Sequence, residues 1–335
     1  MSHKTVLVTG GAGYVGSILV RTLLRRGYRV LCLDNLLCGG ESIIDCWLHP
    51  RFQFFRVDVT KHAEVQRLLD LHPVWGVVHL AAIVGDPACK RSPELAMATN
   101  WEASVMLADE ARERGASRFV FASTCSNYGK MAEGAGYVHE DSPLAPVSLY
   151  AELKVRFEKY LLQESPRKES FCPTSLRFAT VYGVSPRMRF DLTVNEFTKE
   201  LATGRELVVY GEQFWRPYCH VADFSRAILA VLEAPRKKVA YDVFNVGDTA
   251  ENYTKGMILD LLTEHFPRGL IRRVEQLDDP RDYRVRFEKI RDRLGFKVSR
   301  KVPDGIKEIK AMLEAGIIGD PEDQRYYNIP HPRPA

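Results

Sequence analysis

The fold class of this chain follows from the stretch Thr5-Val-Leu-Val-Thr9 and the glycine-rich Gly10-Gly-Ala-Gly-Tyr-Val-Gly16 that comes directly after it. The apolar, largely β-branched run predicts a buried strand. Glycines suit the next positions because the turn is tight and the backbone must approach a pyrophosphate closely. A helix that begins there presents free N–H groups and its positive dipole end to that anion. The stretch therefore predicts a strand–turn–helix unit that binds a dinucleotide.

An acidic residue lies at the end of the next predicted strand after the glycine-rich turn. Asp34 lies 24 residues after Gly10, close to the ~20 expected for a carboxylate that binds an adenosine ribose. A free 2′-hydroxyl suits this carboxylate, whereas a 2′-phosphate would be repelled, and Asn35-Leu36-Leu37 supplies no arginine to accept one. The pattern favours NAD over NADP as the cofactor. The simpler alternative is a solvated aspartate at a strand end.

Short β-branched runs alternate with helical patterns through the first half of the chain, which is typical of βαβ units and a parallel sheet. Further strands are predicted at Arg29–Leu33, Phe52–Asp58, Val74–Ala81, Arg118–Ser123, Thr174–Val181 and Ala240–Val246. Helices are predicted at Gly13–Arg26, Thr60–Leu71, Pro93–Gly115 and Ser148–Gln163. We therefore predict an α/β fold, a Rossmann-type doubly wound parallel sheet with a smaller C-terminal α/β substrate-binding domain.

The two expected domains interleave along the chain. Residues 1–181 form the predicted NAD-binding domain, and residues 217–246 are expected to return to it because Ala240–Val246 has the pattern of a buried strand. From about Tyr182 the segments become shorter and more polar. Residues 182–216 and 247–335 therefore form the predicted substrate-binding domain, which ends in a proline-rich tail.

Composition excludes several functional classes. The net charge of +4 over 335 residues is too small for a protein that binds nucleic acid, which needs a concentrated basic face. No apolar run approaches the ~20 residues that a membrane span requires, and no signal peptide is evident. The seven cysteines are an odd number without a Cys-x-x-Cys pair, which fits reduced thiols in a cytoplasmic protein. No metal site is expected.

Three residues form a candidate catalytic group. Tyr150 and Lys154 lie four residues apart at the start of a predicted helix, hence on one of its faces. A nearby cation favours the phenolate, so Lys154 is expected to lower the pKa of Tyr150 from its ordinary value near ~10. Thr124 ends a predicted strand, at the edge where parallel sheets bind their ligands. Beside a nicotinamide these groups predict a hydride-transfer site, although Tyr and Lys at this spacing also occur by chance on helix surfaces.

Ordered motifs extend this pattern over nearly the whole chain. They are Thr9 to Gly16, Leu33-Asp-Asn-Leu36, Val57-Asp-Val59, His79-Leu-Ala-Ala82, Thr99-Asn100, Ser123 to Gly129, Tyr150 to Lys154, Leu176 to Gly183 and Arg216 to Asp223. With them the chain resembles the extended short-chain dehydrogenase/reductases, a family of NAD-dependent epimerases and dehydratases that act on nucleotide sugars. The resemblance implies an enzyme with NAD as cofactor and a nucleotide-diphosphate sugar as substrate.

The resemblance also assigns roles to individual residues. Tyr150 is the catalytic base and later the acid, Lys154 tunes it, and Thr124 hydrogen-bonds the sugar oxygen that is oxidised. The implied cofactor-binding residues are Gly10, Gly13, Tyr14, Val15, Gly16, Asp34, Asn35, Asp58, Val59, Leu80, Ala81, Ala82, Asn100, Tyr150, Lys154 and Phe178. The implied substrate-binding residues are Thr124, Ser126, Leu192, Tyr210, Arg216 and Arg281. A guanidinium suits a diphosphate, but a solvated surface charge remains an alternative for both arginines.

The residues after Thr124 separate the reactions of this family. Dehydratases carry an acidic pair or a glutamate here, whereas this chain has Cys125-Ser126. Without a carboxylate, elimination lacks its acid and base. The leading hypothesis is therefore an NAD-dependent 4-epimerase that works through a transient 4-keto sugar. A 4-ketoreductase, then a 4,6-dehydratase, are the alternatives, and a catalytically silent NAD-sensing scaffold is the non-enzyme alternative.

Three further points follow from the sequence. Cys125 is interpreted as a packing residue. Arg187-Met-Arg-Phe-Asp191 is expected near the substrate, without an assigned role. In relatives of this kind the helices that correspond to Pro93–Gly115 and Ser148–Gln163 often form a four-helix interface, so we expect a homodimer.

Overall fold

The computed structural model describes residues 4–131, 136–276 and 281–329. The last residues of the proline-rich tail, 330–335, lie outside the described ranges. The main strands are β1 (Thr5–Thr9), β2 (Arg29–Asp34), β3 (Phe52–Arg56), β4 (Gly76–His79), β5 (Arg118–Thr124), β6 (Pro173–Phe178) and β10 (Asp242–Val246). They form one sheet in the order β10-β6-β5-β4-β1-β2-β3, with all neighbours parallel. The chain winds outward from β1 in both directions, so the predicted Rossmann-type sheet is confirmed.

Helices cover both faces of this sheet because alternate residues of each strand face opposite layers. On one face Val6 and Val8 of β1 share an apolar core with α1 (Tyr14–Arg25) and α8 (Val221–Glu233). On the other face Leu7 shares a core with α2 (His62–Leu71), α5 (Ala103–Glu113) and α6 (Leu149–Lys159). Both faces are therefore buried, as a parallel sheet requires.

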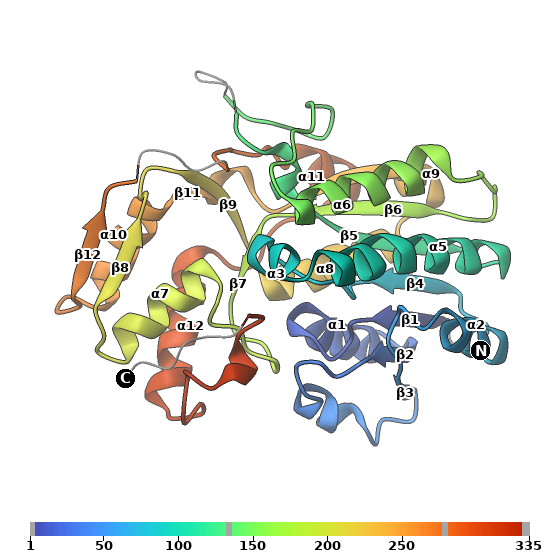
Figure 1. Cartoon of the computed structure of the whole chain (residues 1–335), viewed down its shortest axis with the longest axis horizontal. Helices are drawn as coiled ribbons and strands as arrows, with labels where there is room; N and C mark the ends of the chain where they lie inside the picture. The colour runs from blue at the N-terminus through green and yellow to red at the C-terminus, as the bar shows by residue number, and fades with distance from the viewer. Residues whose placement is uncertain (1–3, 132–135, 277–280, 330–335) are drawn as a thin grey trace.

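A second group of elements lies beyond one end of the large sheet, on the left in Figure 1. Its strands are β7 (Thr180–Tyr182), β8 (Leu207–Tyr210), β9 (Trp215–His220), β11 (Asn252–Thr254) and β12 (Ile271–Val274), and its helices are α7 (Thr193–Ala202), α10 (Lys255–His265) and α12 (Val302–Glu314). The strands pair as β11-β9-β7 and as β12-β8. These elements share a separate apolar core that includes Tyr182, Phe197 and Leu259.

Short elements complete the fold. The α-helices are α3 (Asp86–Arg91), α4 (Pro93–Met97), α9 (Arg236–Val239) and α11 (Glu288–Leu294). Short 3₁₀ helices span Glu41–Cys46, Cys125–Tyr128, Thr249–Glu251 and Gln324–Tyr326, and π-helical turns span Ala98–Glu102 and Tyr160–Glu164.

Most predicted elements differ from the structure by one or two residues at their ends, and three of them are divided. The helix predicted at Pro93–Gly115 consists of α4, the first π-helical turn and α5. The helix predicted at Ser148–Gln163 changes to a π-helical turn after Lys159. The strand predicted at Thr174–Val181 divides at Ala179, because β6 pairs with β5 and β10 whereas β7 pairs with β9. A continuous apolar run cannot show which sheet its second half joins.

All seven cysteines are free thiols, and six of them are buried. Within the described ranges no helix is both long enough and apolar enough to cross a membrane. The same residues contain no cluster of three or more His, Cys, Asp or Glu side chains placed to hold a metal ion.

Candidate active site

A cavity of about 470 Å³ opens at the carboxyl ends of the large sheet's strands. This is the edge at which doubly wound sheets bind their ligands. The predicted residues that line it are Gly10, Gly13, Tyr14, Val15, Gly16, Asp34, Asn35, Asp58, Val59, Leu80, Ala81, Ala82, Thr124, Tyr150, Lys154 and Phe178. The fold therefore brings the predicted dinucleotide residues and the predicted catalytic group to one cavity.

The glycine-rich turn has the shape that a pyrophosphate requires. Gly10 has a φ of +71°, a conformation that favours glycine. A Cβ on Gly16 would lie 2.1 Å from the Gly10 carbonyl oxygen, so the turn can pass this close to α1 only with glycine there. The first turn of α1 begins at Tyr14, which itself lines the cavity. Its free N–H groups form an anion site that fits the pyrophosphate of NAD.

Asp34 is held in place at the end of β2 by backbone donors. One carboxylate oxygen accepts from the N–H of Ala12 at 3.0 Å and the other from the N–H of Leu36 at 2.8 Å. Burial raises the pKa of Asp34 above its ordinary value, while these two bonds oppose the rise. Next to it, the Asn35 amide donates to Asp58 at 2.8 Å and ties the ends of two strands together. These bonds fix the carboxylate at the cavity, and its contact with a ribose stays a prediction.

The predicted catalytic group comes from β5 and α6, whereas Asp34 ends β2. The Thr124 hydroxyl oxygen accepts a hydrogen bond from the Ser126 N–H at 3.1 Å, which leaves its own proton available to donate. Lys154 Nζ donates to the Ala122 carbonyl oxygen at 2.8 Å and lies 5.8 Å from the centre of the Tyr150 ring. All three side chains line the cavity.

The pKa of Tyr150 differs from the expectation. Burial raises it well above its ordinary value, and Cys89 and Asp86 raise it further, whereas Arg189 lowers it. Burial also lowers the pKa of Lys154 to about 8. The pKa of Tyr150 is therefore raised, whereas a value below the ordinary one was expected, because desolvation of the phenol outweighs the effect of nearby cations.

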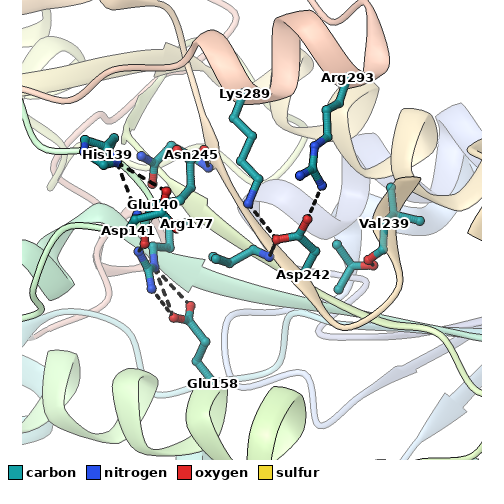
Figure 2. A network of polar contacts seen from close by, with 12 residues as sticks. His139, Glu140, Asp141, Glu158, Arg177, Val239, Asp242, Asn245, Lys289 and Arg293 are labelled. Carbon is teal, nitrogen blue, oxygen red and sulfur yellow. Dashed lines mark hydrogen bonds and ion pairs between the residues drawn. The ribbon is translucent and has the colours of Figure 1, made fainter. Parts of the chain in front are cut away.

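A buried polar network fixes α6 and the loop after Thr124 to the sheet, and Figure 2 shows its pair of Arg177 and Glu158. The Arg177 guanidinium on β6 donates to the Glu158 carboxylate on α6, at 2.5 Å for the shortest pair. It also donates to the Tyr128 hydroxyl at 2.9 Å, and Tyr128 donates to Asn245 at 2.8 Å. The Cys125 thiol, 1% exposed, donates to the Arg177 carbonyl oxygen. Cys125 is thus a packing residue, as interpreted.

Of the predicted substrate residues, Ser126 and Arg216 both contact Tyr283, and Arg281 pairs with Asp86. The Tyr283 hydroxyl donates to Ser126 at 3.4 Å, and the Arg216 guanidinium lies 5.5 Å from the Tyr283 ring centre. Arg281 forms an ion pair with Asp86 at 3.1 Å. Asp86 in turn accepts from the Ser148 hydroxyl, which caps the helix that carries Tyr150. This cluster lies beside the catalytic group and outside the residues that line the cavity.

The other predicted residues lie apart from the cavity lining. Tyr210 is 53% exposed on β8, and Leu192 packs into the small core that contains Tyr14. Asn100 lies beneath the cavity wall, where its amide donates to the Ile83 carbonyl oxygen at 2.9 Å and accepts from the Ile83 N–H at 2.8 Å. Because Ile83 lines the cavity, Asn100 shapes the wall instead of facing a ligand.

Comparison with known proteins identifies the family. The model of the NAD dependent epimerase/dehydratase family matches residues 6–247. The chain belongs to this family. It is therefore an enzyme whose cofactor is NAD, and the glycine-rich turn and Asp34 fit that cofactor.

Several members of the family are similar to this chain along most of their length. A UDP-glucose 4-epimerase of Lacticaseibacillus casei is 28% identical over 319 residues, 88% of this chain and 91% of that protein. The UDP-glucose 4-epimerase of Thermotoga maritima, solved with UDP-glucose, is 26% identical with a TM-score of 0.82, over 94% of this chain and all of that chain. The enzyme of Thermus thermophilus, solved with NAD, is 27% identical with a TM-score of 0.79, over 92% and 99%.

Several residues at or near the site have no role assigned from the sequence. Arg187, Arg189, Cys38 and Asn328 line the cavity, and Tyr283 joins Ser126 to Arg216. The two arginines stood out as an unassigned motif, and the structure places them at the cofactor cavity. Tyr283 and Asn328 gave no signal, because their positions depend on how distant segments pack.

Proposed function

We propose that this enzyme is an NAD-dependent nucleotide-sugar 4-epimerase that acts through a transient 4-keto sugar. One observation carries the proposal: Thr124, Tyr150 and Lys154 share a cavity with the dinucleotide residues, and neither residue after Thr124 is a carboxylate. The similar enzymes named above are UDP-glucose 4-epimerases. A UDP-hexose is therefore the substrate to test first.

Each catalytic residue has a distinct task in this proposal. Thr124 donates to the 4-oxygen of the sugar and orients it, and Tyr150 takes the proton of that hydroxyl and later returns it. Lys154 and Arg189 are the cations that favour the phenolate of Tyr150. NAD, when bound, supplies the acceptor and donor of hydride. If the keto sugar rotates in the site before hydride returns to it, the configuration at C4 is inverted and no net oxidation occurs.

The cavity lining argues against the dehydratase alternative. Among its described residues the carboxylates are Asp34 and Asp58, which are bonded to the backbone and to Asn35 at the adenosine end. Elimination needs an acid and a base beside the sugar. Cys125 is 1% exposed and its thiol donates to a carbonyl oxygen, so it does not supply either group.

The test is conversion without added cofactor. Purified protein should retain NAD and interconvert UDP-glucose and UDP-galactose, followed by NMR or chromatography, with dTDP, GDP and CDP sugars as comparison. Tyr150→Phe should lower turnover by roughly 10²- to 10⁴-fold and leave bound NAD unchanged. Turnover that survives this substitution would refute the role of Tyr150. Stoichiometric consumption of NADH or NADPH with a keto sugar would replace the epimerase with a ketoreductase.

Assembly and location complete the proposal. We propose a homodimer in which α5, α6 and their π-helical turns form a four-helix interface, supported by the partly exposed Trp101, Met106 and Tyr160 along them. Light scattering should give twice the chain mass, and Met106→Glu should give monomers. The seven free thiols support a cytoplasmic location.

A further inference from the structure

Lys199 on α7 is a buried cation that neither the catalytic group nor the predicted cofactor residues explain. Its side chain is 1% exposed, and its Nζ donates to the Glu322 carboxylate at 2.7 Å and to the Tyr327 hydroxyl at 3.1 Å. The Glu200 carboxylate lies 2.5 Å from the same nitrogen. Burial lowers the pKa of Lys199, but the bonds to Glu200 and Glu322 outweigh this effect and raise it above its ordinary value. Lys199 therefore keeps its charge and attaches α7 to a segment 123 residues further along the chain.

This segment, residues 320–329, is also attached to the chain beside the cofactor cavity. The Phe190 N–H donates to the Tyr326 carbonyl oxygen at 2.9 Å, and the two rings pack edge to face, with centres 5.6 Å apart. Two residues further on, the Asn328 N–H donates to the Asp191 carboxylate at 3.1 Å. These contacts bring Asn328 to the cavity, whose lining it joins.

The same segment lies close to elements on the other sides of the cavity. Tyr327 is 6% exposed and belongs to the same small apolar core as Tyr14, in the first turn of α1. Burial raises the pKa of Tyr326, and the charge of Glu41, in the 3₁₀ helix after β2, raises it further. The loop that leads to this helix lines the cavity at Cys38. Segment 320–329 therefore lies beside the cavity between the residues after β7 and those after β2.

We propose that Lys199 is a positioning residue for the cofactor: through Glu322 and Tyr327 it holds segment 320–329 in place, so that Asn328 covers bound NAD and slows its release. Undocking the segment separates a buried ion pair, which is costly, so the segment stays docked. Hydride can return to the sugar from which it came only if one NAD molecule stays bound throughout. The proposal rests on the NAD cofactor and does not depend on which sugar is epimerised.

The test measures how fast NAD leaves the full chain, without any sugar. Excess alcohol dehydrogenase and ethanol convert released NAD to NADH, whose absorbance reports the release rate. We expect Lys199→Met to raise this rate roughly tenfold to a hundredfold, because the Glu322 carboxylate loses its buried partner and the segment undocks more often. Asn328→Ala leaves the charges in place and should raise the rate about threefold to tenfold.

A comparison of rates distinguishes positioning from a merely structural role. NAD also enters past the segment, so Lys199→Met should bind NAD faster as well, and the affinity should change less than the release rate. The double variant Lys199→Met/Glu322→Leu removes both buried charges and leaves Arg205 beside Glu200, so it should return release to within about threefold of the wild type.

Arg226→Met is the matched control, because it breaks an ion pair with the buried Asp223 outside the cavity lining. It should lower the melting temperature and leave NAD release within about twofold. If Lys199→Met lowers the melting temperature but also leaves release within twofold, Lys199 is merely structural and the proposal is wrong. Wild-type release from Asn328→Ala, or release from the double variant as fast as from Lys199→Met, overturns it too. If Lys199→Met does not fold, Asn328→Ala decides alone.

Discussion

Glu158→Gln should destabilise this enzyme far more than its small chemical change suggests. The Glu158 and Arg177 side chains are each 5% exposed, and Arg177 donates to both oxygens of the carboxylate. Ser175 donates to the same carboxylate at 2.7 Å. An amide cannot balance the guanidinium charge, and its NH₂ group faces donors. Removing one partner of a buried ion pair costs about 3–5 kcal/mol, a large share of the ~5–15 kcal/mol that stabilises a typical protein.

Urea unfolding of the full chain, followed by circular dichroism, measures this cost. The matched control is Glu233→Gln, which breaks the exposed pair with Arg26, whose side chains are 36% and 59% exposed. That change should cost less than about 1 kcal/mol. The double variant Glu158→Leu/Arg177→Met removes both charges and should lose less than either single variant. A loss below about 1 kcal/mol for Glu158→Gln, or additive losses in the double variant, would refute the reasoning.

Two further predictions concern the cavity. Gly16→Ala should abolish NAD retention, because its Cβ would lie 2.1 Å from the Gly10 carbonyl oxygen. Retention is measured as the nucleotide released from denatured protein, and Gly319→Ala, whose Cβ would have no atom within 4 Å, is the control. Normal retention in Gly16→Ala would contradict the prediction. Burial lowers the pKa of Lys154 from 10.5 to about 8, so between these values the unfolded chain binds more protons and the stability of the nucleotide-free wild type rises with pH. Relative to Lys154→Met, the wild type should therefore gain about 3 kcal/mol from pH 8 to 10.5, and parallel stability curves would disprove the shift.

Local signals in the sequence were enough to predict which residues of the cofactor half meet at one cavity, and their contacts with the cofactor stay a prediction. The glycine-rich turn and Asp34 are specified by strand ends and short spacings, and both line the cavity. Arg187 could be noticed but not assigned, because its place at the cavity depends on the attachment of Gly183 and Ser185 to α1. The pKa of Tyr150 was mispredicted because a spacing shows that a cation is near but not how deeply the phenol is buried.

Tyr150 and Lys154 belong to a longer pattern on one face of α6. Glu158 follows Lys154 by four residues, as Lys154 follows Tyr150, so the three side chains lie one above another along the helix. Each of the last two is attached to the sheet, Lys154 through the Ala122 carbonyl oxygen and Glu158 through Arg177. These two contacts fix both the height and the rotation of the helix. The position of the Tyr150 hydroxyl is therefore set by a charge pair two turns away, which is why a stability variant at Glu158 should also impair turnover.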